Sequence, residues 1–179
     1  MEKLRKLVLV MGIVFLSVTF ITSANAQDIP KLSDAEIASV AVVANQNDID
    51  FANIAIKKSM NPEVLNFAKS MIADHQSVID MAVELVTKLG VTPMDNAVSK
   101  QYSENAKETM KMLKSKSAMS FDKAYVDNEV TYHEAVIGAV KTVLIPQAQN
   151  DELKGLLEKV VPILETHLDH AKMIQSKLK

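Results

Sequence analysis

The amino-acid sequence predicts an all-α fold, and three features lead to that prediction. Glycine and proline are scarce, with 4 Gly and 5 Pro in 179 residues, while good helix formers such as alanine, leucine, methionine, lysine and glutamate are common. Apolar residues recur every three or four positions along four long segments, which is the spacing of one face of a helix. No segment shows the two-residue alternation that is typical of a strand.

Residues 1–26 are predicted to be a signal peptide rather than part of this fold. Lys3, Arg5 and Lys6 precede an apolar run over residues 7–21, and the sequence ANA at residues 24–26 fits the cleavage pattern of a signal peptidase. The apolar run is about 15 residues long, shorter than the ~20 residues that cross a bilayer as a helix. We therefore expect cleavage after this segment and export to the periplasm.

The mature chain is then a linker over residues 27–31 and one helical domain over residues 32–179. Cleavage removes one acidic and three basic residues, so the formal charge changes from −2 to about −4. The chain has no cysteine, which excludes disulfides, thiol chemistry, iron–sulfur clusters and cysteine-ligated zinc. It has no basic cluster, so no nucleic-acid partner is expected, and no second segment is apolar enough to cross a membrane.

The first two long helices have clear start and stop signals. Ser33 and Glu36 have the spacing of a capping box, and the first helix is expected to run from there to about Ser59. The second helix is expected to begin at Pro62, after Asn61 as its N-cap. Its apolar stripe continues to Gly90, a residue that commonly ends helices.

The second pair of long helices is read in the same way. The third is expected to have Ser120 as its N-cap and to end near Pro146. The fourth begins near Asn150 and continues to the C-terminus, with a kink expected at Pro162. About 30 residues separate the second helix from the third, far more than an antiparallel turn needs, with a short helix around residues 100–113. A connection of this length suits the full-length crossover of a ferritin-like four-helix bundle.

Three of the four histidines occupy apolar-stripe positions, each on a different long helix. His75 and His133 each lie thirteen residues, or ~20 Å, into their helices, and His167 is near the middle of the fourth helix. Asp48 reaches the same depth on the first helix. These four side chains are expected to converge on one layer.

Neighbouring side chains are candidates to supplement that layer. Glu129 precedes His133 by one helical turn and His170 follows His167 by three residues, so each shares a helix face with a layer histidine. Tyr125, Tyr132 and Asp74 are candidate hydrogen-bond partners.

Two interpretations of the layer remain open at this stage. In one, His75, His133 and His167, with Asp48, Glu129 and His170 as supplements, bind one divalent metal ion such as zinc, iron, manganese or copper. In the other, the histidines are hydrogen-bonded core residues of a structural, interaction or chaperone-like protein. A third reading, a metal-dependent enzyme, needs an open coordination position; we expect binding without catalytic turnover. A protein partner, a small ligand and homo-oligomerisation are compatible with every reading.

Three segments and one histidine also resemble those of one protein family. The sequence MIADH at residues 71–75, FDKAY at 121–125 followed by His133, and PILETHL at 162–168 are similar to motifs of the domain-of-unknown-function 4142 family. The resemblance covers about residues 32–178 and implies a ferritin-like bundle and export, with no established activity. Asp48 stands where that family usually has a glutamate. The chain has no Glu-x-x-His motif, so oxygen-activating di-iron chemistry is not expected.

Overall fold

The structure, a computed structural model, describes residues 31–178, and the predicted signal peptide lies outside them. The helices are α1 (Asp34–Lys58), α2 (Pro62–Leu89), α3 (Ala97–Ser115), α4 (Ala118–Ala139), the π-helical turn η1 (Val140–Leu144), α5 (Ile145–Gln147) and α6 (Asp151–Lys177). There is no strand within residues 31–178. The prediction of an all-α fold is therefore confirmed for this range.

Local sequence signals account for most helix boundaries. The Ser33 hydroxyl accepts a hydrogen bond from the Glu36 N–H, and the Glu36 carboxylate accepts one from the Ser33 N–H, so the predicted capping box starts α1. Asn61 and Asn150 cap α2 and α6 in a similar way through their side-chain oxygens. Gly90 follows α2 with φ at 65°, a left-handed conformation that glycine adopts without a steric penalty.

Two predicted boundaries are wrong. The helix that carries His133 begins at Ala118 with Ser117 as its N-cap, whereas Ser120 was expected in that position. Ser117 makes no side-chain capping hydrogen bond, and its hydroxyl instead hydrogen-bonds that of Ser120, three residues later, at 3.0 Å. The short helix of the crossover is also longer than residues 100–113, because Asn96 and Ser99 form a capping box that starts α3 at Ala97.

The end of α4 contains a π-helical turn that the sequence analysis did not anticipate. Residues 118–147 form one continuous rod in which η1 separates α4 from α5. The Ile145 N–H bonds the Val140 carbonyl, five residues earlier. Pro146, which follows, has no N–H to donate, and its ring clashes with a carbonyl four residues earlier in a regular helix. The wider π turn accommodates this proline, and the rod ends one residue beyond it.

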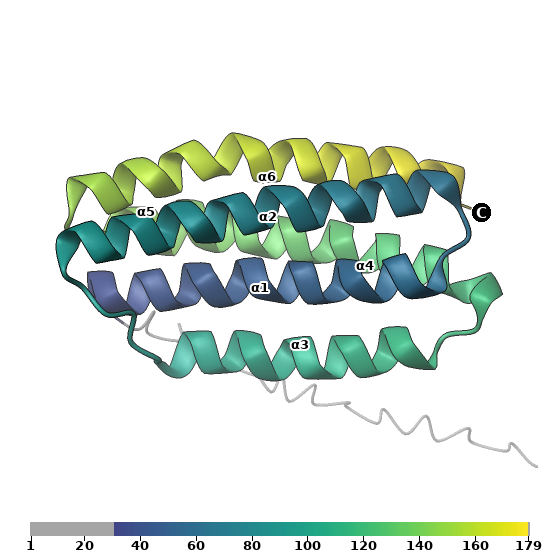
Figure 1. The fold of residues 1–179 in the computed structure, drawn as a ribbon, viewed down its shortest axis with the longest axis horizontal. Helices are drawn as coiled ribbons and strands as arrows, with labels where there is room; N and C mark the ends of the chain where they lie inside the picture. The colour runs from purple at the N-terminus through teal and green to yellow at the C-terminus, as the bar shows by residue number, and fades with distance from the viewer. Residues whose placement is uncertain (1–30, 179) are drawn as a thin grey trace, which may run out of the picture.

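The helices lie alongside one another as an all-helical bundle (Figure 1). α1 packs on α2, α4 packs on α6, and the two pairs meet through contacts of α2 with α6 and of α1 with α4. Figure 1 shows α1 and α6 running in one direction and α2 and α4 in the opposite direction. α3 lies against α1 and carries the chain back along the length of the molecule between α2 and α4.

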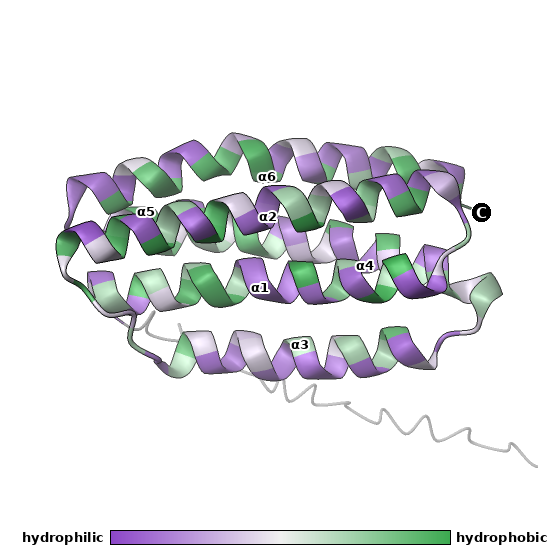
Figure 2. Cartoon of the chain, in the orientation of Figure 1, coloured by the Kyte–Doolittle hydropathy of each residue, from purple (hydrophilic) through white to green (hydrophobic). Residues whose placement is uncertain are grey.

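Each long helix has hydrophobic and hydrophilic residues distributed around it (Figure 2), and the buried hydrophobic ones form two clusters. One cluster includes Phe51, Phe67 and Phe121, and the other includes Val40, Val140 and Leu153. The layer between them is polar and buried, and it contains Asp48, His75, Glu129, His133 and His167. On every long helix, a residue of this polar layer therefore lies between residues of one apolar cluster and residues of the other.

The α3 crossover is attached to the other helices by polar contacts as well as by apolar ones. The Lys58 ammonium donates to the carbonyls of Leu113, Lys114 and Lys116 at 3.4, 2.6 and 2.8 Å, at the C-terminal end of α3. The Asn47 amide donates to the Tyr102 carbonyl at 3.2 Å.

α6 passes through Pro162 as a single helix. None of the helices within residues 31–178 has the length and hydropathy needed to cross a bilayer.

Candidate metal centre

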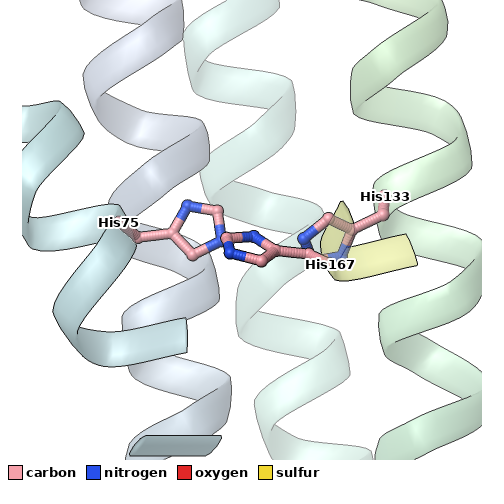
Figure 3. Close-up of side chains that lie close together, drawn as sticks. All are labelled: His75, His133 and His167. Carbon is pink, nitrogen blue, oxygen red and sulfur yellow. The ribbon is translucent and has the colours of Figure 1, made fainter. Parts of the chain in front are cut away.

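Three histidine rings meet in the polar layer between the two apolar clusters. His75 comes from α2, His133 from α4 and His167 from α6, and only 2%, 1% and 5% of their surfaces are exposed. The ring centroids are separated by 5.1 to 5.6 Å. Figure 3 shows the three side chains pointing toward one another. Asp48 on α1 is 1% exposed and lies in the same layer, so each long helix contributes at least one side chain.

The hydrogen bonds of His75 determine which of its nitrogens carries the proton. The Asn45 amide nitrogen donates to the Ala41 carbonyl at 2.8 Å, which orients the amide so that its oxygen faces His75. That oxygen lies 2.7 Å from His75 Nδ1. Because an amide oxygen only accepts, Nδ1 holds the hydrogen and Nε2 presents a lone pair to the layer.

His133 and His167 follow the same rule with different acceptors. His133 Nδ1 lies 3.0 Å from the Glu129 backbone carbonyl, which only accepts, so Nδ1 is the donor. His167 Nε2 donates to the Asp74 carboxylate at 2.9 Å. The remaining nitrogens, His133 Nε2 and His167 Nδ1, are buried without a hydrogen-bond partner among residues 31–178, as is His75 Nε2. Three imidazole lone pairs therefore face the interior of the layer.

The spacing of these atoms matches the ligands of a small cation. One nitrogen from each of the three rings lies within 4.8 Å of the others. Asp48 Oδ2 is 3.3 Å from His75 Nε2 and 3.6 Å from His133 Nε2. A tetrahedral ion with bonds of roughly 2.0–2.1 Å separates its ligand atoms by about 3.4 Å. Both nitrogens carry a lone pair and no hydrogen, so their contacts with the Asp48 carboxylate are not hydrogen bonds. A cation bound between these atoms would replace the repulsion among them with attraction.

A second acidic side chain, Glu129, is fully buried beside this set. Its carboxylate lies 3.6 Å from His133 Nδ1, and Asp48, Glu129 and His133 each offer an atom within 4.8 Å of the other two. Burial first and the Asp48 charge second raise the pKa of Glu129 well above its ordinary value. Burial also acts to raise the pKa of Asp48, but His75, His133 and Glu129 outweigh it and bring it below its ordinary value. The two shifts have opposite directions, so Glu129 is the carboxyl of this pair that keeps its proton to higher pH.

Burial favours the neutral forms of His75 and His167. Burial lowers the pKa of His75 to about 4, against the opposing attraction of Asp48. Burial likewise lowers the pKa of His167, partly offset by its hydrogen bond to Asp74. Neutral imidazole is the form that binds metals, so His75 does not need to lose a proton at neutral pH.

The structure does not bring every predicted residue into this cluster. His170 lies outside both candidate metal-binding groups found within residues 31–178, and its ring packs edge-on against Phe67 at 5.1 Å. The Tyr132 hydroxyl donates to the Ala44 carbonyl at 2.9 Å rather than to a histidine. The Tyr125 hydroxyl is buried without a partner among the described residues. Of the three residues expected to be hydrogen-bond partners, Asp74 therefore contacts a layer histidine directly.

Asn45 is the contact that the sequence analysis missed. It lies three residues before Asp48 on α1, which places both side chains on one helix face, and this spacing was the available signal. The position of Asn45 opposite His75 depends on how α1 and α2 pack, and the spacing of residues along α1 does not predict this packing.

The geometry defines a class: an all-helical protein with a buried cluster of three histidines and two acidic residues. The chain belongs to the family described as "Domain of unknown function (DUF4142)", whose model matches residues 20–174. This match confirms the family resemblance of the sequence motifs. No curated protein and no solved structure matches the chain.

Proposed function

We propose that this protein binds one divalent transition-metal ion in the polar layer, through His75, His133, His167 and Asp48. Glu129 lies close enough to act as an additional ligand once its carboxyl releases its proton. Imidazole and carboxylate ligands are suited to zinc, iron, manganese and copper.

The observation that carries this proposal is the orientation of the three imidazoles. Each ring donates one N–H to an acceptor outside the cluster, namely Asn45, the Glu129 carbonyl or Asp74. Such acceptors on the far side of metal-bound histidines set the tautomer and the ring orientation. Three lone pairs and the ionised Asp48 carboxylate facing one another repel without a cation, and a bound cation replaces this repulsion with attraction.

We also propose that the bundle is a four-helix bundle of the ferritin-like kind and that the protein is exported to the periplasm. The direction of the helices and the α3 crossover support the first statement, because α2 and α4 run parallel and are linked along the full length of the bundle. The signal-peptide pattern of residues 1–26 supports the second.

Binding rather than turnover fits the burial of the site. The five side chains of the site are all 5% exposed or less, so they present little surface to a bulky substrate; they are His75, His133, His167, Asp48 and Glu129. This favours a metal-binding protein of the cell envelope, for instance one used under metal stress, over a hydrolase with a large substrate.

The test compares two histidine variants on the same helix. His167→Ala removes a proposed ligand, while His170→Ala removes a histidine three residues away whose ring contacts Phe67 instead. Elemental analysis is made on protein purified from its native compartment without chelator, followed by Zn²⁺ titration of the metal-free protein.

We expect about one equivalent of metal in the unmodified protein and in His170→Ala, and at least a ~10-fold lower affinity in His167→Ala. Equal metal content and Zn²⁺ affinity in the two variants would refute the ligand assignment. Protein that contains no metal and takes up no Zn²⁺ would make the histidines hydrogen-bonded core residues of a structural or interaction protein.

A further inference from the structure

A cavity adjoins the histidine layer on the side away from the phenylalanine cluster. It has a volume of about 40 Å³ and lies between α1, α2, η1, α4 and α6. At one end it is bounded by Asp48, His75 and His133. Its walls are small or branched apolar side chains, among them Ala44, Ala82, Val136, Val140, Leu157 and Leu164.

The size of the cavity restricts what it can hold. A water molecule requires roughly 10–15 Å³ of cavity volume measured in this way, so about three molecules of that size fit. An alkyl chain or an aromatic metabolite requires the helices to move apart. A diatomic molecule fits without any rearrangement.

The chemistry of the walls disfavours water away from the polar end. An ordered water needs two to four polar partners, and the alanine, valine and leucine walls offer none. Apolar cavities of this kind stay dry and take up neutral, polarisable guests such as xenon. Among the residues that line the cavity, the polar atoms without a partner in residues 31–178 belong to the end that borders the layer: His75 Nε2, His133 Nε2 and Asp48 Oδ1.

The outer surface of the layer, between α2 and α6, has a different character. His167 does not line the cavity; with Asp74 and His170 it lines a hollow on the surface between α2 and α6. Asp74 is exposed over about half of its side chain, at 49%. A hydrated cation and a neutral apolar molecule thus meet different surroundings at this hollow and at the cavity.

The π-helical turn forms part of the cavity wall. Val140 and Leu144, the first and last residues of η1, both line the cavity. A π turn shifts the backbone relative to a regular helix, and such turns occur frequently at functional sites. In this chain the turn lies two helical turns beyond His133, on the helix that provides this ligand candidate.

We propose that the cavity is a binding site for a small, neutral, apolar molecule of about the size of dioxygen, presented to the Asp48, His75 and His133 face of the metal centre. The position of the metal rests on the proposed function, but the binding site itself does not. The cavity is bounded by protein atoms alone, so it is testable in metal-free protein.

Xenon is the probe, because it is neutral and apolar and enters dry cavities. Xenon binding to the metal-free protein is measured by the concentration dependence of the ¹²⁹Xe NMR shift. Ala82→Leu is designed to fill the cavity, Leu157→Ala to enlarge it, and Ala135→Leu is a matched control because Ala135 is exposed on α4.

We expect saturable binding of xenon in the unmodified protein and in Ala135→Leu, an affinity at least about tenfold lower in Ala82→Leu, and tighter binding in Leu157→Ala. If Ala82→Leu does not fold, Leu157→Ala still tests the site. Absence of saturable binding in the unmodified protein, or binding that neither cavity variant changes, would overturn the proposal. If the proposed metal centre is wrong, this is seen separately, by comparing the metal content of His167→Ala with that of His170→Ala.

Discussion

The buried Glu129 carboxyl allows a sharp test of the electrostatics of the layer. Its raised pKa means that the folded protein keeps this proton at a pH where the unfolded chain has released it. Replacement by glutamine keeps the shape of the protonated side chain and removes its titration. We therefore expect the stabilities of the unmodified protein and of Glu129→Gln to diverge as the pH rises.

The sign follows from proton linkage. Above pH ~4.5 the folded state binds one proton more than the unfolded state, so the free energy of unfolding falls with rising pH. The stabilisation is fully present below the unfolded pKa and is lost as the pH rises toward and through the folded pKa. The slope in this window is up to about 1.4 kcal/mol per pH unit. Glu129→Gln lacks this slope, while titrations elsewhere in the chain affect both proteins alike.

The assay is urea unfolding of both metal-free proteins at pH 5, 6, 7 and 8, in the presence of a chelator. The expected result is that Glu129→Gln gains stability relative to the unmodified protein at each step until the folded pKa is reached. A stability difference that is the same at every pH would show that Glu129 titrates like an exposed acid. The account of a proton held on Glu129 would then be wrong.

Three further changes test single contacts. Asp74→Asn removes the carboxylate that accepts the His167 N–H and should weaken Zn²⁺ binding roughly 10–100-fold, as measured by calorimetry. Asp80→Asn, at an exposed position of the same helix, is the control and should leave the Zn²⁺ affinity unchanged. Lys58→Met removes the ammonium that donates to three carbonyls at the end of α3, and it should lower the free energy of unfolding by about 1–2 kcal/mol in urea titrations. An unchanged unfolding midpoint would contradict the role of Lys58 in attaching α3. Ser33→Ala removes the N-cap of α1 and should cost about 1 kcal/mol in the same assay, whereas Ser33→Gly should recover most of it.

Helix boundaries show where local sequence is sufficient and where it is not. The starts of α1, α2 and α6 follow from Ser33, Asn61 and Asn150, because an N-cap hydrogen bond involves residues two or three positions apart. The N-cap of α4 is Ser117 rather than Ser120, and residue type alone does not distinguish two serines three residues apart. The π turn of η1 was not foreseen, since Pro146 indicates an interruption but not the form that the backbone takes.

The sequence by itself determined the helices, the apolar stripe of each one and the depth at which His75, His133, His167 and Asp48 lie, because these follow from a constant rise and period along a helix. Only the tertiary structure decided which nitrogen of His75 and which nitrogen of His167 faces the interior. The acceptors that set the tautomers of His75 and His167, Asn45 and Asp74, come from different helices, so their positions depend on how α1, α2 and α6 pack. The same holds for the cavity beside the layer, since its walls are contributed by residues far apart in the chain.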